Sequence, residues 1–576
     1  MMRPFRFSPA LPQNPAFTIG DGLILLGLAT LLYAGTRLAF NAPTVLQGPE
    51  ISLSPMALPW YALLSVGRMA AAYFLSLLFS LVYGYASARN QTARMVLMPM
   101  LDVLQSVPIL SFLPVVLLSL TAVLPKYLAA ELAAVVLIFT SQAWNITFSF
   151  YQSLTTIPGE LSEAAAVFRL NPWARFKTLE LPIAALGLVW NSMMSWSGGW
   201  FFLMAAEIFK VGTRDFRLPG IGSYLQTAAN QGNLVAVFWG MSTLILVILL
   251  LDQLVWRPLT VWSAKFNLET VGKEEPMSSW FLELLSKAWL VKQFDVFLWK
   301  PGNEWIDRLL QRRFGSHIAV PERTAKNEKP SRLAKSLILG FALLVSYGGY
   351  RAAGVLVKLP SNDWAQLGMG IGATFLRVGA SLLLAMLWTI PLGVAIGTSR
   401  RLAAVLQPMV QVVAAIPATA LFPVVLLILL QAPGGLNIAA VALMLMGTQW
   451  YLLFNIIAGA AAIPQDLRET TELLGLSRLD RWRTLILPAL FPYIVTGGIT
   501  ASGGAWNASI IAEHVEFAGQ THFVSGVGAL IARATGAGDY PMLLAATLIL
   551  VFTVIVINRT FWLRLYRLAE RRYHIE

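Results

Sequence analysis

The chain has 576 residues, of which 57% are hydrophobic and 12% are charged, and its formal net charge is +13. Soluble globular proteins carry roughly 25% charged residues. A chain with about half that share and a mean hydropathy of +0.66 is therefore expected to be a polytopic membrane protein. The absence of cysteine excludes disulfides and thiolate chemistry.

The first apolar run follows a polar, proline-rich segment and has no small-residue cleavage site after it, which indicates a retained membrane helix rather than a signal peptide. A helix needs about 20 apolar residues to cross ~30 Å of hydrocarbon, and each crossing should be helical because lipid offers the backbone no hydrogen-bond partner. The sequence predicts an all-α polytopic membrane protein with about 12 transmembrane helices. In chain order these are 21–41, 60–87, 97–122, 128–155, 177–206 and 236–262, then 334–357, 366–397, 403–430, 436–460, 484–512 and 541–562. The fifth span of each set contains a glycine pair, Gly198-Gly199 or Gly503-Gly504, which is a candidate break.

The basic residues orient these spans. Twelve crossings put both termini on one side of the membrane, and loops rich in lysine and arginine stay in the cytoplasm. The bases that this topology places inside are Arg3, Arg6, Arg89, Arg94, Arg400, Arg401, Arg559, Arg564, Arg567, Arg571 and Arg572. We therefore expect a multi-pass protein of the bacterial inner membrane with cytoplasmic N- and C-termini. The net charge of +13 follows mostly from this topology, so no nucleic-acid partner is expected.

The sequence contains an internal duplication. Pro99, Pro108 and Pro114 recur 309 positions later as Pro408, Pro417 and Pro423. Pro158, Glu163, Pro182, Trp200, Glu207, Gly220, Gly222 and Trp256 recur 306 positions later as Pro464, Glu469, Pro488, Trp506, Glu513, Gly526, Gly528 and Trp562. The change of offset places three extra residues in the first copy, near Pro125. Two six-helix halves of equal orientation should be related by a pseudo-twofold axis along the membrane normal.

These repeats divide the chain into three parts. The first six-helix domain covers 1–262, with a core repeat at 58–262, and the second covers 333–576, with a core repeat at 364–572. The linker at 263–332 is charged and has no apolar run of 20 residues, so it is expected in the cytoplasm. Two of its segments place Trp, Phe and Leu at helical spacing with bases between them, which favours amphipathic helices lying at the membrane surface. A docking surface for a regulator or partner is the alternative.

A short polar segment follows the fourth span of each half. EAAAVFRLNPWARFKTLELP runs from Glu163 to Pro182, and ETTELLGLSRLDRWRTLILP runs from Glu469 to Pro488. Each follows an Ile-Pro pair, and proline suits the first turn of a helix. The glutamate is expected near the start of a short helix, where the helix dipole favours an acid. Gly475, which adopts positive φ readily, marks a turn in the second copy. The pattern predicts a short helix, a turn and a second helix at the cytoplasmic surface.

This layout resembles the Glu-Ala-Ala loop of permease subunits in binding-protein-dependent ABC importers, whose motif continues through Gly and Ile to Leu-Pro. The residues that carry the resemblance, and to which it assigns ATPase coupling, are Glu163, Ala164, Ala165, Arg169, Leu181, Pro182, Glu469, Thr470, Thr471, Gly475, Leu487 and Pro488. Arg169 stands where the family has glycine, Thr470 and Thr471 replace the alanines, and Leu179 and Leu485 replace isoleucine. The proline-rich third span and the Ala-Glu pairs at 206–207 and 512–513 resemble the nitrate/taurine branch, including its duplicated, fused members.

The resemblance implies an ABC importer permease of the MetI-like type with two permease domains in one chain. It implies two cytoplasmic ATPases as partners, identical or different, and a periplasmic solute-binding protein. ATP and Mg²⁺ would bind to the ATPases, because this chain has no Gly-x-x-x-x-Gly-Lys-Ser/Thr loop, and no cofactor is expected in the chain itself. The implied solute is a small anion such as nitrate, a sulfonate, bicarbonate or an organic anion.

Ionisable groups at membrane depth are candidates for the solute pathway. The matched glutamates of the fifth spans, and the small and aromatic residues near them where the backbone could approach a solute, are the candidates. They are Ser197, Gly198, Gly199, Trp200, Glu207, Gly503, Gly504, Trp506 and Glu513. The alternative for the glutamates is that each caps the end of the fifth span or pairs with a base such as Lys210, and the alternative for the glycines is helix packing. Lys210, Arg214 and Arg217 fall on the outer side and favour an anion weakly, and contact with a solute-binding protein or with membrane phospholipid is the alternative.

Other classes of protein fit less well. His514 and His522 flank Glu516, but without the tight spacing of metal ligands, so no metal is expected. No Ser-His-Asp grouping indicates an enzyme. A secondary transporter of the major-facilitator type shares 12 spans and a parallel repeat, and it is the main alternative. It leaves the paired Glu…Leu-Pro loops unexplained.

Overall fold

The computed structural model describes residues 19–40, 42, 47–211, 214–266, 279–288, 332–429, 433–517 and 520–572, together with isolated positions between 293 and 308. Arg3 and Arg6 and most of the second amphipathic segment of the linker lie outside the described residues. The described chain is almost entirely helical, as the sequence predicts, and its strands form two short antiparallel hairpins.

The first half consists of six long helical regions with short elements between them. Its elements are α1 (Ile19–Ala39), the 3₁₀ turn η1 (Pro55–Ala57), α2 (Leu58–Arg89), α3 (Gln91–Ser106), α4 (Ile109–Thr121), α5 (Lys126–Thr155), α6 (Gly159–Val167), α7 (Pro172–Arg175), the π-helical η2 (Phe176–Glu180), α8 (Leu181–Glu207), β1 (Lys210–Val211), β2 (Arg214–Asp215), α9 (Ile221–Asn230), α10 (Leu234–Leu251), the π-helical η3 (Asp252–Trp256), α11 (Arg257–Ser263) and η4 (Ala264–Phe266). The linker contributes α12 (Trp280–Lys287).

The second half repeats this order. Its elements are α15 (Arg332–Leu356), α16 (Ser361–Thr398), α17 (Arg400–Ala415), α18 (Ala418–Leu429), α19 (Gly435–Ala461), α20 (Gln465–Leu473), α21 (Arg478–Arg481), the π-helical η7 (Trp482–Ile486), α22 (Leu487–Ala512), β3 (His514–Phe517), β4 (Gln520–Phe523), α23 (Val527–Ala537), α24 (Tyr540–Ile557), the π-helical η8 (Asn558–Trp562) and α25 (Leu563–Arg572). The π-helical segments recur at the same offset of 306 as the sequence matches, so the repeat extends to local backbone detail.

Among the described residues, eight helices are long and apolar enough to cross a membrane, and the bent pair α3–α4 makes a ninth. The prediction of about 12 spans exceeds this number. Helices α8 and α15 and the pair α17–α18 occupy the remaining predicted positions, at 177–206, 334–357 and 403–430. The chain is therefore a multi-pass membrane protein.

The breaks in the helices differ from those expected. The predicted span 97–122 is two helices, α3 and α4, bent by 96°, and 403–430 likewise divides into α17 and α18. Val107 and Ile416 each precede a proline and are extended, with ψ of 124° and 118°, because the proline ring disfavours helical geometry in the residue before it. The glycine pairs cause no break, since α8 and α22 run continuously through them.

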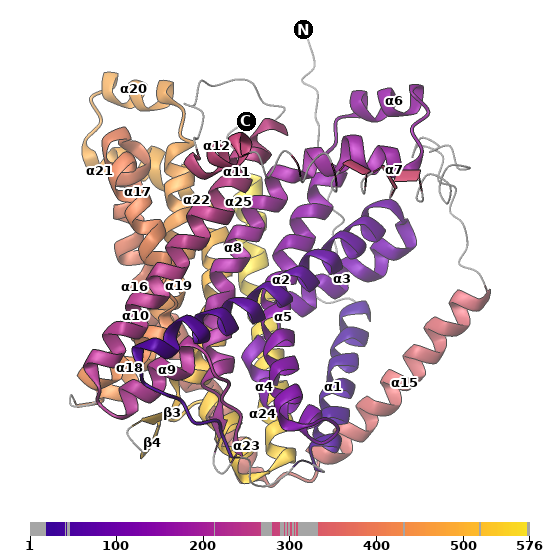
Figure 1. The fold of residues 1–576 in the computed structure, drawn as a ribbon, viewed down its shortest axis with the longest axis vertical. Coiled ribbons are helices and arrows are strands. Elements are labelled where there is room, and N and C mark those ends of the chain that lie inside the picture. The colour runs from indigo at the N-terminus through magenta and orange to yellow at the C-terminus, as the bar shows by residue number, and fades with distance from the viewer. Residues whose placement is uncertain are drawn as a thin grey trace.

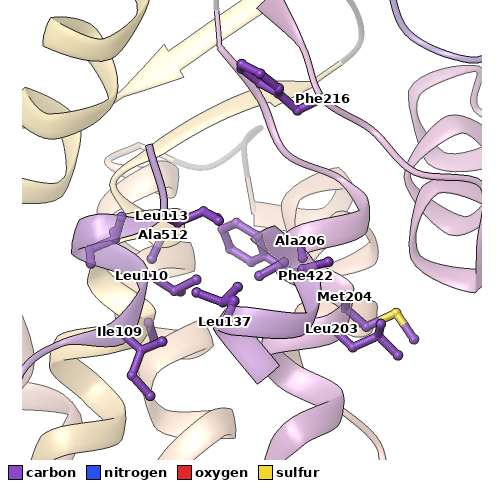
Figure 2. Packing of buried hydrophobic residues seen from close by; sticks show 14 of the residues in the cluster. Ile109, Leu110, Leu113, Leu137, Leu203, Met204, Ala206, Phe216, Phe422 and Ala512 are labelled. Atoms are coloured by element: carbon purple, nitrogen blue, oxygen red, sulfur yellow. The ribbon is translucent and has the colours of Figure 1, made fainter. Parts of the chain in front are cut away.

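The two halves cross over each other through α4 and α18. Helix α4 packs against α22, α23 and α24 of the second half, and α18 packs against α8 and α9 of the first. The amide of Leu110 donates to Asn507 Oδ1 at 3.2 Å, and the hydroxyl of Thr419 donates to the carbonyl of Phe201 at 3.4 Å. These two bonds join positions that correspond across the repeat, which confirms the pseudo-twofold relation. Figure 2 shows Leu110, Leu113, Phe422, Ala206 and Ala512 in the buried cluster where the halves meet.

The short elements divide between the two ends of the helical bundle. Helices α6 and α20 project at one end, beside α12 and α25, whereas the hairpin β3–β4 and helix α23 lie at the opposite end (Figure 1). We refer to these as the α6/α20 end and the hairpin end. The pattern agrees with the predicted topology, in which both polar loops share one side.

The first helices of the two halves, α1 and α15, pack unequally, since α1 also packs against α3 and α4 of its own half. Helix α15 packs along α1 of the first half, and the hydroxyl of Thr30 donates to the carbonyl of Val345 at 2.8 Å. A side chain at Gly348 would meet Thr30 at 2.1 Å, so the helices approach closely at a glycine. Only residues 357–360 join α15 to α16, and four residues span at most about 14 Å. Helix α15 therefore stays near the start of α16.

The linker contacts the first half. Helix α12 lies within the first of the two predicted amphipathic segments, and its Trp280 donates to Gln253 at 3.3 Å. Farther along, Asp307 accepts from the indole of Trp173 at 2.9 Å and from Lys177 Nζ at 2.5 Å. These donors, Lys177 first, hold the pKa of Asp307 below its usual range. The aspartate is therefore charged at neutral pH, and its contribution is lost only in acid, as the pH falls below the usual aspartate range through this lowered pKa.

Replacing Asp307 by alanine should release the linker from the α7–η2 segment, because both donors lose their shared acceptor. We expect faster amide hydrogen exchange around residues 172–180 and no change around the matching residues 478–486. Glu304→Ala is the matched control, since Glu304 is exposed and pairs only with Arg308 in the described chain. Equal protection of residues 172–180 in both variants would contradict a supporting role for Asp307.

Candidate functional site

The two predicted helices of the polar loops are present as α6 and α20, and both are exposed. Each begins directly after the expected proline, Pro158 or Pro464. Glu163 and Glu469 lie in the second turn, not at the helix start, because each helix begins four residues earlier; the acids of the first turn are Glu160 and Asp466. Both predicted glutamates point to solvent.

Each helix rests on its neighbours through one small residue and exposes an apolar pair at its end. Ala165 and Thr471 occupy matching positions and are buried. The exposed pairs also match, and they are Val167 with Phe168 and Leu473 with Leu474, between 69% and 88% exposed. Large apolar side chains so far out in solvent are typical of protein contacts. The sequence analysis missed these pairs, although their identical offset was available as a signal.

Both helices end in the same left-handed turn. Gly475 has φ of +61°, and Arg169, which replaces the family glycine, has φ of +50°. The amide of Arg169 donates to Ala166 and that of Leu170 to Ala165, and Gly475 and Leu476 make the corresponding bonds to Glu472 and Thr471. The first loop therefore turns as the second does, at the conformational cost of a side chain in the left-handed region.

The predicted Leu-Pro pairs open the next long helices, since Leu181-Pro182 begins α8 and Leu487-Pro488 begins α22. The turn before each pair is π-helical, and the amide of Leu181 donates to the carbonyl of Phe176, five residues back. Pro182 has no amide hydrogen, and its ring would crowd the preceding turn of an α-helix. The wider turn joins α7 and α8 without a gap, so each polar loop is attached rigidly to a membrane helix.

The first loop is fixed by charges that the second lacks. Glu180 is 1% exposed and pairs with Arg89 and with Arg175, whose Nε lies 2.9 Å from Glu180 Oε1. The matching position in the second half is Ile486, also buried. The two loops therefore share a backbone path but differ in how they are held.

Glu207, a candidate for the solute pathway, lies at the end of α8 in a saturated hydrogen-bond network. It is fully buried and accepts from Ser65 Oγ at 2.6 Å, from Arg68 Nη1 at 2.9 Å and from the amide of Gly222 at 2.7 Å. Arg68 also donates to both oxygens of Glu131. This network, which we call the first lock, ties α2, α5, α8 and α9 together at the hairpin end.

Glu513 forms the second lock at the matching place. It accepts from Thr374 at 2.7 Å, from Arg377 at 2.7 Å and from the amide of Gly528 at 2.9 Å, and Arg377 donates further to Asn437. A Cβ at Gly526 would lie 2.1 Å from a Glu513 oxygen, so the carboxylate requires glycine there. Sequence reasoning missed Arg68 and Arg377, although they share the offset of 309.

Some of the other pathway candidates are buried, and the others are exposed or face open space. Trp200 and Trp506 are each 1% exposed, and Gly199 packs against Gln142 and Met69. Ser197 is exposed, Gly503 faces open space, and the neighbouring glycines lie near Tyr451 and Thr448. The exposed positions continue along both helices at helical spacing, as Trp190 and Met194 on α8 and as the matching Thr496 and Thr500 on α22.

A cavity of about 460 Å³ lies between the halves toward the hairpin end. It is lined from both halves by Leu110, Leu113, Pro114, Ala205, Ile208, Phe209, Lys210, Arg217, Gln226, Asn230, Phe422, Ile510, Ile511, His514, Val515, Gln520, Thr521, Ile531 and Ala532. The sequence analysis predicted Lys210 and Arg217 on the outer side of the membrane, and the structure brings both to the cavity. None of the nine pathway candidates lines it.

Arg214, the third predicted outer base, is buried and donates to the carbonyl of Thr535 in the second half at 3.4 Å. In the described part of the chain no three His, Cys, Asp or Glu side chains are grouped so as to hold a metal ion. His514 and His522 lie on adjacent strands, paired with Phe523 and Val515 respectively.

Residues 55–255 and 389–575 each match the family described as the binding-protein-dependent transport system inner membrane component, and the two matches cover more than half of the chain. The chain is 31% identical over 209 residues to the nitrate import permease protein NrtB of Leptolyngbya laminosa, covering 34% of this chain and 73% of that protein. It is 32% identical over 143 residues to the bicarbonate transport system permease protein CmpB of Synechococcus elongatus (25% and 50%), and 26% identical over 149 residues to the taurine transport system permease protein TauC of Escherichia coli (26% and 53%). The chain thus spans between half and three quarters of the length of these relatives.

Glu513→Ala should leave the half-buried Arg377 without its acid and should remove the buried acceptor of the Gly528 amide. Removing one partner of a buried pair costs about 3–5 kcal/mol, and we expect that loss in the free energy of unfolding of the detergent-solubilised protein. Glu513→Gln should lose less, since the amide oxygen still accepts from Gly528. The exposed Glu283→Ala serves as control and should stay within about 0.5 kcal/mol of the original. An Ala variant as stable as this control would exclude a stabilising lock.

The left-handed turns predict opposite effects of two substitutions. Arg169→Gly should stabilise the first turn and Gly475→Ala should destabilise the second, each by about 1 kcal/mol, because only glycine adopts positive φ without strain. Nothing lies within 4 Å of a Cβ at Gly475, so no clash confuses the comparison. Amide exchange of residues 165–176 and 471–482 measures both. A change of the same sign in both loops would contradict the strain at Arg169.

Proposed function

The chain belongs to the family of binding-protein-dependent transport system inner membrane components, and we propose that it forms the solute pathway of an ABC importer for a small anion and couples it to separate cytoplasmic ATPases. It is a transport subunit of the ABC permease type, not an enzyme. The proposal assigns ATP and Mg²⁺ to the partner subunits. The major-facilitator alternative finds no support in the relatives.

The observation that carries the proposal is the matched pair α6 and α20 at one end of the bundle (Figure 1). Each is exposed, ends in the same turn and continues through a π-helical segment into a long helix that reaches the boundary between the halves. A force applied to α6 or α20 by a soluble partner would therefore move α8 or α22 as a rigid body, which is the way packed elements switch between two states.

The α6/α20 end is assigned to the cytoplasm, with both termini. Arg559, Arg564 and Arg567 belong to η8 and α25, which lie at this end, and arginine-rich segments stay inside. The proposed domain division, with permease domains at 1–262 and 333–576 around a linker at 263–332, puts the linker at the same end. Two ATPase subunits, and a periplasmic solute-binding protein at the hairpin end, complete the proposed assembly.

The arrangement of α8 and α22 supports a pathway open toward the α6/α20 end. Their outer parts contact the opposite half through Phe201 and Asn507. Four and seven residues earlier, on the same helical faces, Ser197, Met194 and Thr500 are exposed. The halves thus meet at the hairpin end and part toward the other end, and the proposed pathway includes Ser197, Gly198, Gly503 and Gly504.

Proteins named for nitrate, bicarbonate and taurine are similar to this chain, and each of those solutes carries an anionic oxygen group. Lys210 and Arg217 at the cavity support an anion for this chain as well.

Reversing the charge of the coupling helices tests the proposal. The double variant Glu163→Arg, Glu469→Arg should keep its fold, because both side chains are exposed, but should uncouple uptake from ATP hydrolysis. Loss of a charged contact is worth about 1.5–3 kcal/mol, so anion uptake per ATP hydrolysed by the complex purified with its ATPase should fall about tenfold or more.

Glu283→Arg, an exposed reversal in the linker at the same end, is the matched control and should transport normally. Because the chain has no cysteine, single cysteines at Val167 and Leu473 can also be cross-linked to the ATPase without background. Normal coupled uptake by the double variant, together with no cross-link at either cysteine, would reject the docking role of α6 and α20.

A further inference from the structure

The boundary between the halves is bridged on one side by helices that lie outside the repeat. We call this boundary, where α4 of the first half packs against α24 of the second, the first seam. Helix α1 packs against α3 and α4 and also against α24, and α15 packs against α1 and α24 (Figure 1). Both α1 and α15 lie outside the residues 55–255 and 389–575 that match the family. Two additional helices therefore cover the first seam.

Hydrogen bonds and close packing hold α1 to both halves at the first seam. The hydroxyl of Tyr540 on α24 donates to the carbonyl of Ala39 on α1 at 2.7 Å. The hydroxyl of Ser119 on α4 donates to the carbonyl of Gly35 on α1 at 2.8 Å. A Cβ at Gly35 would lie 2.5 Å from a methyl group of Val115 on α4, so the two helices approach closely there. Close approach at small residues, with hydrogen bonds between helices, is how helices associate in lipid.

Within the described residues, the matching boundary is left uncovered, and we call it the second seam. It lies between α18 and α10, both of which pack against α9. Phe238 of α10 is 65% exposed, whereas its match Leu544 of α24 is 1% exposed. Leu234 of α10 is also 65% exposed, and its match Tyr540 is 7% exposed. On α18, Ile428 is 69% exposed. The pseudo-twofold relation of the core therefore ends at the outer surface.

The lengths of two connectors explain this difference. Residues 40–54 join α1 to η1, whereas residues 357–360 join α15 to α16. Four residues span at most about 14 Å, so α15 is held beside the start of α16, which itself packs against α24. The first helices of both halves consequently lie at the first seam, and neither is left to cover the second.

The two seams would respond differently to a force. Opening the first seam would separate the packed faces of α1, α4 and α24 and break the bond between Tyr540 and Ala39. Each pair of atoms that loses contact also loses its dispersion attraction. The matching faces of α10 and α18 are already exposed, so widening the second seam would lose fewer contacts.

We propose that the first seam is a hinge and that the halves open and close at the second seam. The inference rests on the proposed import function and deepens it by naming the axis about which the halves turn. Force that enters at α6 and α20 would rotate one rigid half against the other about α1 and α15. The pathway would then widen on the side of α10 and α18, unlike the equal rocking of two identical halves.

Two pairs of spin labels test the hinge, because the chain has no cysteine and single cysteines can be placed at will. Leu31 of α1 with Phe552 of α24 reports on the first seam. Ile428 of α18 with Leu246 of α10, the match of Phe552, reports on the second. All four side chains are exposed. The full chain is labelled, assembled with its ATPase in nanodiscs, and measured by pulsed electron paramagnetic resonance without nucleotide and with ATP whose hydrolysis is blocked.

The distance between Ile428 and Leu246 should change on ATP binding by about 5 Å, the scale of a one-turn shift between packed elements. The distance between Leu31 and Phe552 should change by no more than about 1–2 Å, the scale of a small helix shift. Equal changes at the two seams, or a larger change at the first, would overturn the proposal.

A variant that crowds α1 away from α4 tests the cause. Gly35→Leu should free the first seam, because the added side chain would meet Val115, and the Leu31–Phe552 distance should then respond to ATP by about as much as the second pair. Gly22→Leu is the matched control on the same helix, since nothing lies within 4 Å of a Cβ there, and it should leave the first seam fixed. If both variants behave alike, α1 does not hold the hinge.

Uptake measurements distinguish failure of the hinge from failure of the import function. If ATP-dependent uptake of nitrate depends on Glu163 and Glu469 while the two distances change alike or not at all, the importer assignment holds and the hinge is rejected. If no anion is taken up and the coupling variants behave as the original chain, the proposed function itself fails.

Discussion

A buried carboxylate at the end of α8, and its counterpart at the end of α22, sets the geometry on which the rest of this structure depends. A charge in an apolar interior is tolerated only with full hydrogen bonding and an opposite charge. Glu207 meets that condition through Arg68, Ser65 and the amide of Gly222, and these partners come from α2 and α9. The carboxylate therefore fixes three helices at one point, and the hairpin that follows α8 starts from that fixed point.

The locks also explain where the molecule is closed and where it is open. The halves are joined through α4 and α18, at Phe201 and Asn507, which lie six residues before the lock glutamates Glu207 and Glu513 on α8 and α22. Away from this level, Met194 and Thr500 on the facing helices are exposed. Movement at α6 or α20 would then be transmitted along α8 or α22 toward the locks at the hairpin end, which suits a pathway that opens and closes between two packed halves.

The repeat conserves geometry more strictly than chemistry. Arg169 adopts the left-handed turn of Gly475, and Asn437 takes the place of Glu131 as the second partner of an arginine. The two halves differ most in the residues that hold the polar loops and in those that line the cavity. Glu180 and Asp307 hold the first loop, Ile486 replaces the acid in the second, and Lys210 and Arg217, which line the cavity, both belong to the first half. A fused chain allows such divergence, because each copy always meets the same partner half.

The sequence by itself determined the all-α membrane fold, the internal duplication and the two polar loops, because apolar runs, constant offsets and Pro/Gly placement depend on neighbours within the chain. It also placed Arg169 and Gly475 at corresponding positions, but only the structure showed that the first loop turns at Arg169 as the second does at Gly475. Only the tertiary structure decided that Glu207 and Glu513 belong to locks with Arg68 and Arg377, that the prolines at 108 and 417 and not the glycine pairs break the helices, and that Lys210 meets Phe422 across a cavity. The locks and the cavity join residues more than 100 positions apart, whereas the helix breaks lie directly at prolines that the sequence already shows. They follow from helix packing and from the pairing of buried charges, which no local spacing encodes.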